Sequence, residues 1–194
     1  MSSLKSDSQL SALSLSETGG FDYLLIDGVK IEPVLKWVYQ QIDNPEWYPL
    51  YKDTRYQDVI DLSPCLVKVP IGSDIPHLFE SELGPKGSAI WLRSNHQVEV
   101  LGALLSRLLW ITTEDGRYLH YRFYDPISLS RLIPALTPDE SAQLYHGIES
   151  ITWFNAQHQA WQKLILSASE ALLSQSSGAV FKQQWLDAIL TVSE

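Results

Sequence analysis

The stretch that decides the fold is Trp110 to Leu136, with the sequence WITTEDGRYLHYRFYDPISLSRLIPAL. Asp115-Gly116 predicts a two-residue hairpin turn of type I′, which needs positive φ at both central residues. The aromatic-rich run from Arg117 to Tyr124 predicts a strand. Asp125-Pro126 ends that strand and predicts a helix, with Asp125 as N-cap, Pro126 in the first turn and leucines following at helical spacing. The stretch therefore predicts a hairpin, a sharp corner and a helix.

Arg122 and Asp125 lie in an otherwise aromatic neighbourhood, RFYDP. Charges among aromatic rings are costly unless they are paired. We therefore expect Arg122 to span the corner to a carboxylate or to backbone carbonyls. The alternative is a solvent-facing arginine on an edge strand.

Composition limits the class of protein. The chain has 194 residues, of which 45% are hydrophobic, enough for one domain or for one domain with an appended helical lobe. The 7 Trp and 9 Tyr fit either a core of large aromatic rings or an interface, where both residue types are enriched. A net charge of −9 without a Lys/Arg cluster argues against nucleic acid as a partner.

Cys65 is a lone cysteine, which excludes an internal disulfide and fits a reducing compartment. The N-terminus lacks the charged start, apolar block and cleavage site of a secretory signal. Apolar runs stay short of membrane-spanning length, so we expect no membrane partner and a cytoplasmic location.

The remaining segments predict three regions: a disordered tail over residues 1–19, an α/β domain over 20–154 and a C-terminal helical lobe over 155–194. The predicted fold class is α+β, with a mixed, largely antiparallel sheet covered by helices and a C-terminal helical hairpin. The first helix of that hairpin is expected to begin at Trp161 and the second at Phe181. Helix starts are predicted at Asp74, at Ser94 with Gln97, and at Thr137 with Glu140.

Catalytic motifs are missing from the sequence. It contains no G-x-S-x-G elbow, no glycine-rich phosphate loop and no paired-histidine metal motif. His120 could act as a base, but a core or edge histidine is the more common case. Asp27, Asp61 and Asp125 all lie at strand ends, where such residues usually cap turns. Cys65 is expected to be a buried structural thiol.

Several short motifs, taken together in this order, resemble the bacterial type VI secretion adaptor chaperones, a family with a domain of unknown function. The matching motifs are Tyr23 to Gly28, Ser63 to Val67, Ser94 and Arg107 at the two ends of one helix, and the hallmark run. That hallmark is Asp115-Gly116 followed by Arg122, Phe123, Tyr124, Asp125 and Pro126. The family often has Arg after Asp-Pro and Leu before the helix-terminal Arg, where this chain has Ile127 and Ser106.

The resemblance implies a cytoplasmic chaperone, without enzymatic activity or cofactor, that binds a toxic effector and helps load it onto the spike protein of the secretion tube. We expect Arg122 and Asp125 to determine the fold. Trp47, Tyr48 and Tyr51, together with exposed faces of the last two helices, are the candidate partner-binding surfaces. A second hypothesis is an enzyme or small-molecule-binding domain, which predicts a deep polar pocket joining His120 to Asp27 or Asp61.

Overall fold

A computed structural model describes residues 19–166 and 180–190, so the predicted tail lies almost wholly outside the described residues. The main sheet has six strands in the order β2-β3-β1-β4-β7-β8, and every neighbouring pair is antiparallel. The strands are β1 (Phe21–Ile26), β2 (Trp47–Pro49), β3 (Cys65–Lys68), β4 (Ala89–Ser94), β7 (Ser150–Asn155) and β8 (Ala160–Ile165).

The central strands are buried on both faces, which explains their nearly continuous apolar sequences. In β1, Tyr23 and Leu25 point into one core cluster, while Leu24 and Ile26 point into the other. Side chains alternate across a strand, so a single apolar run supplies both cores.

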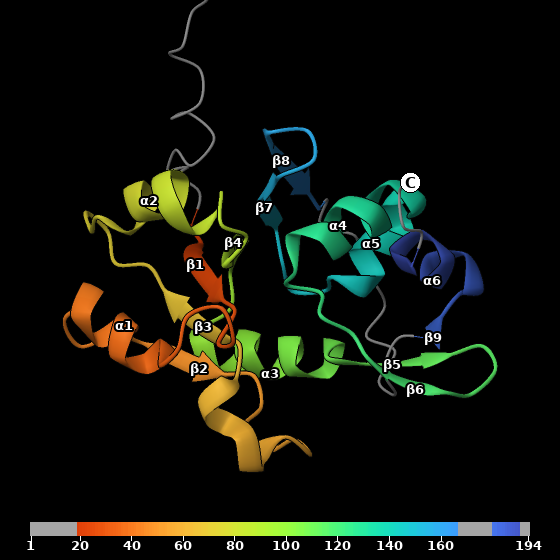
Figure 1. The fold of residues 1–194 in the computed structure, drawn as a ribbon, viewed down its shortest axis with the longest axis horizontal. Helices are drawn as coiled ribbons and strands as arrows, with labels where there is room; N and C mark the ends of the chain where they lie inside the picture. Colours follow the sequence, from red (N-terminus) through yellow and green to blue (C-terminus); the bar gives the residue numbers. More distant parts are fainter. Residues whose placement is uncertain (1–18, 167–179, 191–194) are drawn as a thin grey trace, which may run out of the picture.

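Helices cover the two faces. On one side lie α1 (Val34–Gln41) and α2 (Ile75–Leu78), the latter continuing as the η3 turn (Phe79–Leu83). On the other lie α3 (Val98–Leu108), α4 (Pro126–Leu132) with η4 (Ile133–Ala135), α5 (Pro138–Leu144) and α6 (Gln183–Leu190). Figure 1 shows α1 and α2 on the opposite side of β1 from α4, α5 and α6.

A second, three-stranded sheet carries the predicted hairpin. Its strands are β5 (Trp110–Thr113), β6 (Tyr118–His120) and β9 (Val180–Phe181), with β5 antiparallel to β6 and parallel to β9. The predicted α+β class with mixed, largely antiparallel pairing is therefore confirmed.

The hairpin turn differs in type from the prediction. Gly116 has a φ of 81°, but Asp115 does not have positive φ, so the turn is not type I′. Thr113 and Arg117 pair across a loop of Glu114 to Gly116, with a β-turn hydrogen bond from Gly116 N to Thr113 O at 2.9 Å. This is the longer hairpin loop in which one glycine takes the left-handed conformation.

The strand after the turn is also shorter than predicted, because β6 ends at His120 and not at Tyr124. Tyr121 N still donates to Leu109 O at 2.8 Å, and Asp125 N then closes a turn onto Arg122 O at 3.0 Å. Tyr121 and Phe123 are buried in the core, so packing stabilises this segment in addition to these two hydrogen bonds.

The predicted helix caps have mixed outcomes. Asp125 caps α4, and Thr137 and Glu140 form the capping box of α5, as predicted. The predicted box at Ser94 is wrong: Ser94 ends β4, and Gln97 takes the N-cap position of α3. Asp74 occupies the N-cap position of α2, but its side chain makes no capping hydrogen bond.

The C-terminal helical hairpin was predicted wrongly in its first half. Trp161 to Ile165 lie in strand β8, which pairs with β7 from Asn155↔Ala160 to Ser150↔Ile165. The domain boundary predicted after residue 154 therefore falls inside a β-hairpin of the main sheet. The expected last helix is present as α6, and residues 167–179 lie outside the described part of the chain.

Candidate functional site: the Arg122 corner and the adjoining pocket

Arg122 pairs across the corner with Asp27 at the end of β1, through Arg122 Nη2 and Asp27 Oδ2. The Asp27 side chain is 4% exposed and the Arg122 side chain is 43% exposed. Asp27 Oδ1 also accepts a hydrogen bond from Val29 N at 3.1 Å. The prediction that Arg122 spans the corner to a carboxylate is confirmed, although part of the guanidinium faces solvent.

The surroundings keep this arginine charged. Partial burial lowers the pKa of Arg122, but Tyr124 and Asp27 outweigh burial and raise the pKa above its usual value. Burial also raises the pKa of Tyr124 far above that of a free tyrosine. The corner therefore holds a fixed positive charge, a buried carboxylate and a neutral phenol, an arrangement suited to holding two segments together.

Asp125 forms the second tie at the corner. Its Oδ2 accepts Ser128 N at 3.1 Å, which caps α4, and its Oδ1 lies 3.5 Å from Lys30 Nζ. Lys30 Nζ also donates to Gly87 O at 2.9 Å. The loop after β1 is thus joined to α4 and to the turn before β4.

Gly28 explains why an Asp-Gly pair ends β1. A Cβ at this position would lie 2.2 Å from Ser63 O and 2.8 Å from Leu62 O, both backbone atoms. Only glycine allows the loop after β1 to approach the segment before β3 this closely.

The other residues of the predicted signature are buried, except Arg107. Phe123 and Tyr124 are buried in the core, and Pro126 is buried at the start of α4. Arg107 is exposed in the last turn of α3, where a cation is favoured by the helix dipole.

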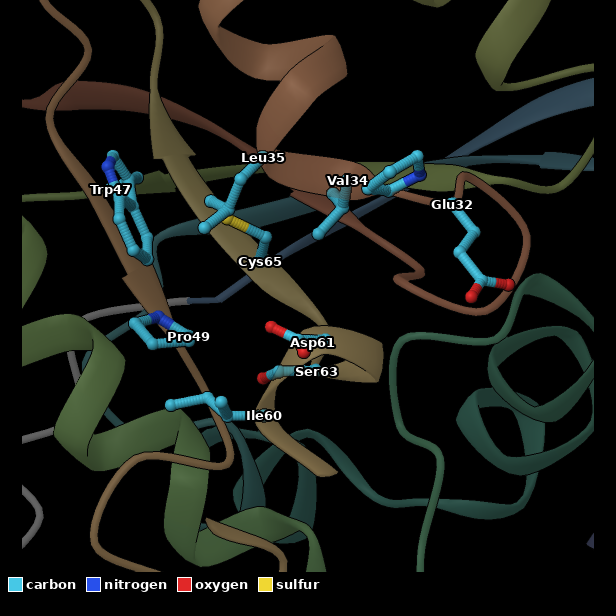
Figure 2. Close-up of a pocket in the computed structure, with 10 residues that line it drawn as sticks. Glu32, Val34, Leu35, Trp47, Pro49, Ile60, Asp61, Ser63 and Cys65 are labelled. Carbon is cyan, nitrogen blue, oxygen red and sulfur yellow. The ribbon is translucent and has the colours of Figure 1, made fainter. Parts of the chain in front are cut away.

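Next to the corner lies an apolar pocket of about 370 Å³ (Figure 2). It opens between α1, the edge strand β2 and the short helix η2 (Gln57–Leu62). Its lining is Glu32, Pro33, Val34, Leu35, Trp47, Pro49, Ile60, Asp61, Ser63 and Cys65. Ser63 is the residue that Gly28 approaches, so the corner and the pocket share one piece of backbone.

The ionisable and hydroxyl groups at the pocket are one buried thiol, one buried hydroxyl and two exposed carboxylates. Burial raises the pKa of the Cys65 thiol to about 12, so the sulfur stays protonated at neutral pH. Cys65 is 1% exposed, which confirms the expected buried thiol. Glu32 and Asp61 are exposed at the pocket, and within the described residues neither carboxylate forms an ion pair.

His120 lies elsewhere, among aromatic rings. Its ring centroid is 5.2 Å from Tyr56, 5.3 Å from Trp110 and 6.3 Å from Tyr51. Burial and then the charge of Arg122 lower the pKa of His120. His120 lines neither this pocket nor a second one beside Asp22 and Arg93, so neither of these two pockets is the deep polar pocket expected to join His120 to Asp27 or Asp61.

The three strand-end aspartates differ in their surroundings. Asp27 pairs with Arg122, Asp125 with Lys30, and Asp61 lies at the pocket. Among residues 19–166 and 180–190, no group of three His, Cys, Asp or Glu side chains is arranged to hold a metal ion.

The aromatic residues suggested for partner binding are mostly internal. Tyr48 and Tyr51 are 9% and 8% exposed and belong to the core, so their rings are not available on the surface. A Cβ on Gly102 of α3 would lie 2.4 Å from the Tyr48 ring, which shows how closely α3 covers it. Trp47 is half-buried and lines the pocket, where its Nε1 donates to Tyr39 Oη at 3.3 Å.

Sequence reasoning missed most of the pocket lining, including Glu32, Leu35 and Ile60. A weak signal was present, since Val34, Leu35 and Val38 form an apolar helical stripe and Leu35 remains only half-buried. No sequence pattern indicates that η2 lies opposite this stripe.

One known protein family matches most of the chain. The family described as Domain of unknown function (DUF4123) matches residues 23–143, which is most of the chain, so this protein belongs to that family. Comparisons with curated proteins and with solved structures found no match. In the part of the chain that the structure describes, no helix has the length and apolar character required to cross a bilayer.

Proposed function

We propose that this protein is a cytoplasmic adaptor chaperone of type VI secretion that binds an effector toxin and helps load it onto the spike protein. The family match and the RFYDP run support this assignment. The main supporting observation is that the signature residues make structural contacts. Arg122 pairs with the buried Asp27, and Asp125 caps α4. They form a scaffold and leave the adjoining apolar pocket open.

An adaptor must hold its cargo and later release it, which favours an interface of moderate size with a few apolar contacts. The pocket supplies such contacts, Tyr39 accepts a hydrogen bond from the pocket residue Trp47, and Val59 precedes the pocket residue Ile60. Tyr39 on α1 is 58% exposed and Val59 on η2 is 44% exposed. Exposed apolar groups of this kind mark interaction surfaces when they adjoin one another.

The test is co-purification from the native host. An affinity-tagged copy of the full chain is expressed at its natural level, and the bound proteins are identified by mass spectrometry. The proposal predicts recovery of a toxin-like effector, a spike protein or both, above a tag-only control. Repeated recovery of neither would rule out the adaptor role.

A further inference from the structure

Two exposed carboxylates border the pocket between α1 and η2, although its floor is apolar. Glu32 precedes α1 and Asp61 lies in η2, while Val34, Leu35, Trp47 and Pro49 supply apolar lining of the same pocket (Figure 2). Both carboxylates are without an ion-pair partner in the described part of the chain.

We propose that this pocket binds one apolar side chain of the effector, from a segment that carries a lysine or arginine next to it. The inference rests on the proposed function, because it assigns the partner-binding site of the same adaptor. The apolar side chain enters between Leu35 and Trp47, and the neighbouring cation lies against Glu32 and Asp61.

Charge complementarity favours a basic effector segment over an acidic or a purely apolar one. The chain has a net charge of −9, so a basic segment is attracted from a distance as well as at contact. An acidic segment would meet two like charges that no cation neutralises within the described residues. A purely apolar segment would leave both carboxylates partly desolvated and without a partner.

The edge strand beside the pocket also favours recognition of a side chain. The pocket volume of about 370 Å³ is near the lower limit of small-molecule pockets. One side is formed by β2, a three-residue edge strand that contains Pro49. Proline has no N–H to offer an added strand, so recognition through the side-chain pocket is favoured over pairing with this edge.

The main test measures binding of the purified effector to full-length variants. The charge reversal Glu32→Lys with Asp61→Lys should weaken effector binding at least about tenfold. The control is Asp58→Lys, which reverses one exposed carboxylate on the same short helix that does not line the pocket. The control should stay within about twofold of wild type. Thermal melts of all variants check that the fold is retained.

The outcomes separate the two proposals. If wild type binds the effector and the double reversal binds equally well, the pocket assignment is overturned and the adaptor role stands. If wild type binds neither effector nor spike protein, the adaptor role fails.

A small probe then tests the pocket by itself. NMR titration with phenethylamine, an aromatic ring carrying a cation, should shift the Trp47 indole resonance. The matched probe 3-phenylpropionate has the same ring with a negative charge and should bind at least about fivefold more weakly. Equal binding of the two probes would overturn the charge selection.

Discussion

Arg122 holds its guanidinium against a carboxylate that is nearly out of contact with water. Water can still reach part of the arginine, but Asp27 depends on this partner and on Val29 N. Removal of Arg122 should therefore lower the free energy of unfolding mainly through Asp27, because an unpaired buried charge is costly.

Arg122→Ala should lower the free energy of unfolding by about 2–3 kcal/mol, less than for a fully buried pair because the arginine is half-exposed. Arg117→Ala is the matched control, since Arg117 and Asp115 pair with side chains 59% and 56% exposed. The control should cost less than about 1 kcal/mol. Urea denaturation measures both values. Equal losses in the two variants would show that the Arg122–Asp27 pair does not stabilise the fold.

His120 gives the fold a dependence on pH. Its folded pKa is lowered from 6.5, by burial first and by Arg122 second, so the unfolded chain takes up the proton more readily. Protonation of this histidine therefore favours unfolding, and its contribution to stability is lost as pH falls below the unfolded pKa.

The melting temperature of wild type should fall as the pH is lowered from about 7.5 to about 5.5. The melting temperature of the His120→Gln variant should fall less over the same interval. Differential scanning calorimetry at a series of pH values measures the two slopes. The same slope in both proteins would mean that other groups cause the pH dependence.

At the scale of elements, the start of α4 depends on Asp125. The carboxylate accepts the free N–H of Ser128 and lies near Lys30, so one side chain both caps a helix and holds the loop after β1. These two effects can be separated by substitution.

Asp125→Ala should cost about 1–2 kcal/mol of unfolding free energy, because both the cap and the charge are lost. Asp125→Asn keeps an oxygen that can cap the helix, so it should recover more than half of that loss. Chemical denaturation compares the two variants. If Asn is as damaging as Ala, the Lys30 contact and not the cap is the main contribution.

Sequence motifs correctly predicted the helix starts that depend only on neighbouring residues. The Asp125-Pro126 start of α4 and the Thr137 capping box depend on residues within one helical turn, and both are present. Ser94 has the same sequence signal, but its Oγ donates to Gly147 O at 2.6 Å, a residue far away in sequence. Ser94 is also still paired with Phe21 in the ladder of β1 and β4, so the chain leaves the sheet only after this residue and the helix begins three residues later.

The error at β8 has a similar cause. Trp161, Leu164 and Ile165 have helical spacing, but pairing with β7 overrides it, and the Trp161 ring packs 5.0 Å from that of Phe79. Asn155 was an available sequence signal, because asparagine is common in turns. In the structure its Oδ1 accepts both Gln157 N and His158 N in the turn between β7 and β8. Much of the pocket was not predictable, because it depends on η2 meeting α1 across the sheet edge.

At the scale of the whole molecule, the corner, the loop after β1 and the pocket form one continuous structure. Asp27 and Lys30 fix the loop on the side of α4, and Gly28 brings it against Ser63, which lines the pocket. We therefore regard the signature as the support of a binding surface that includes α1, β2 and η2.

The most direct test of this account is hydrogen–deuterium exchange of the full chain with and without its purified effector. We predict slower exchange in the effector complex at residues 31–35 and 57–63, on the two sides of the pocket. Unchanged exchange in both segments, with protection at a distant part of the protein, would contradict it.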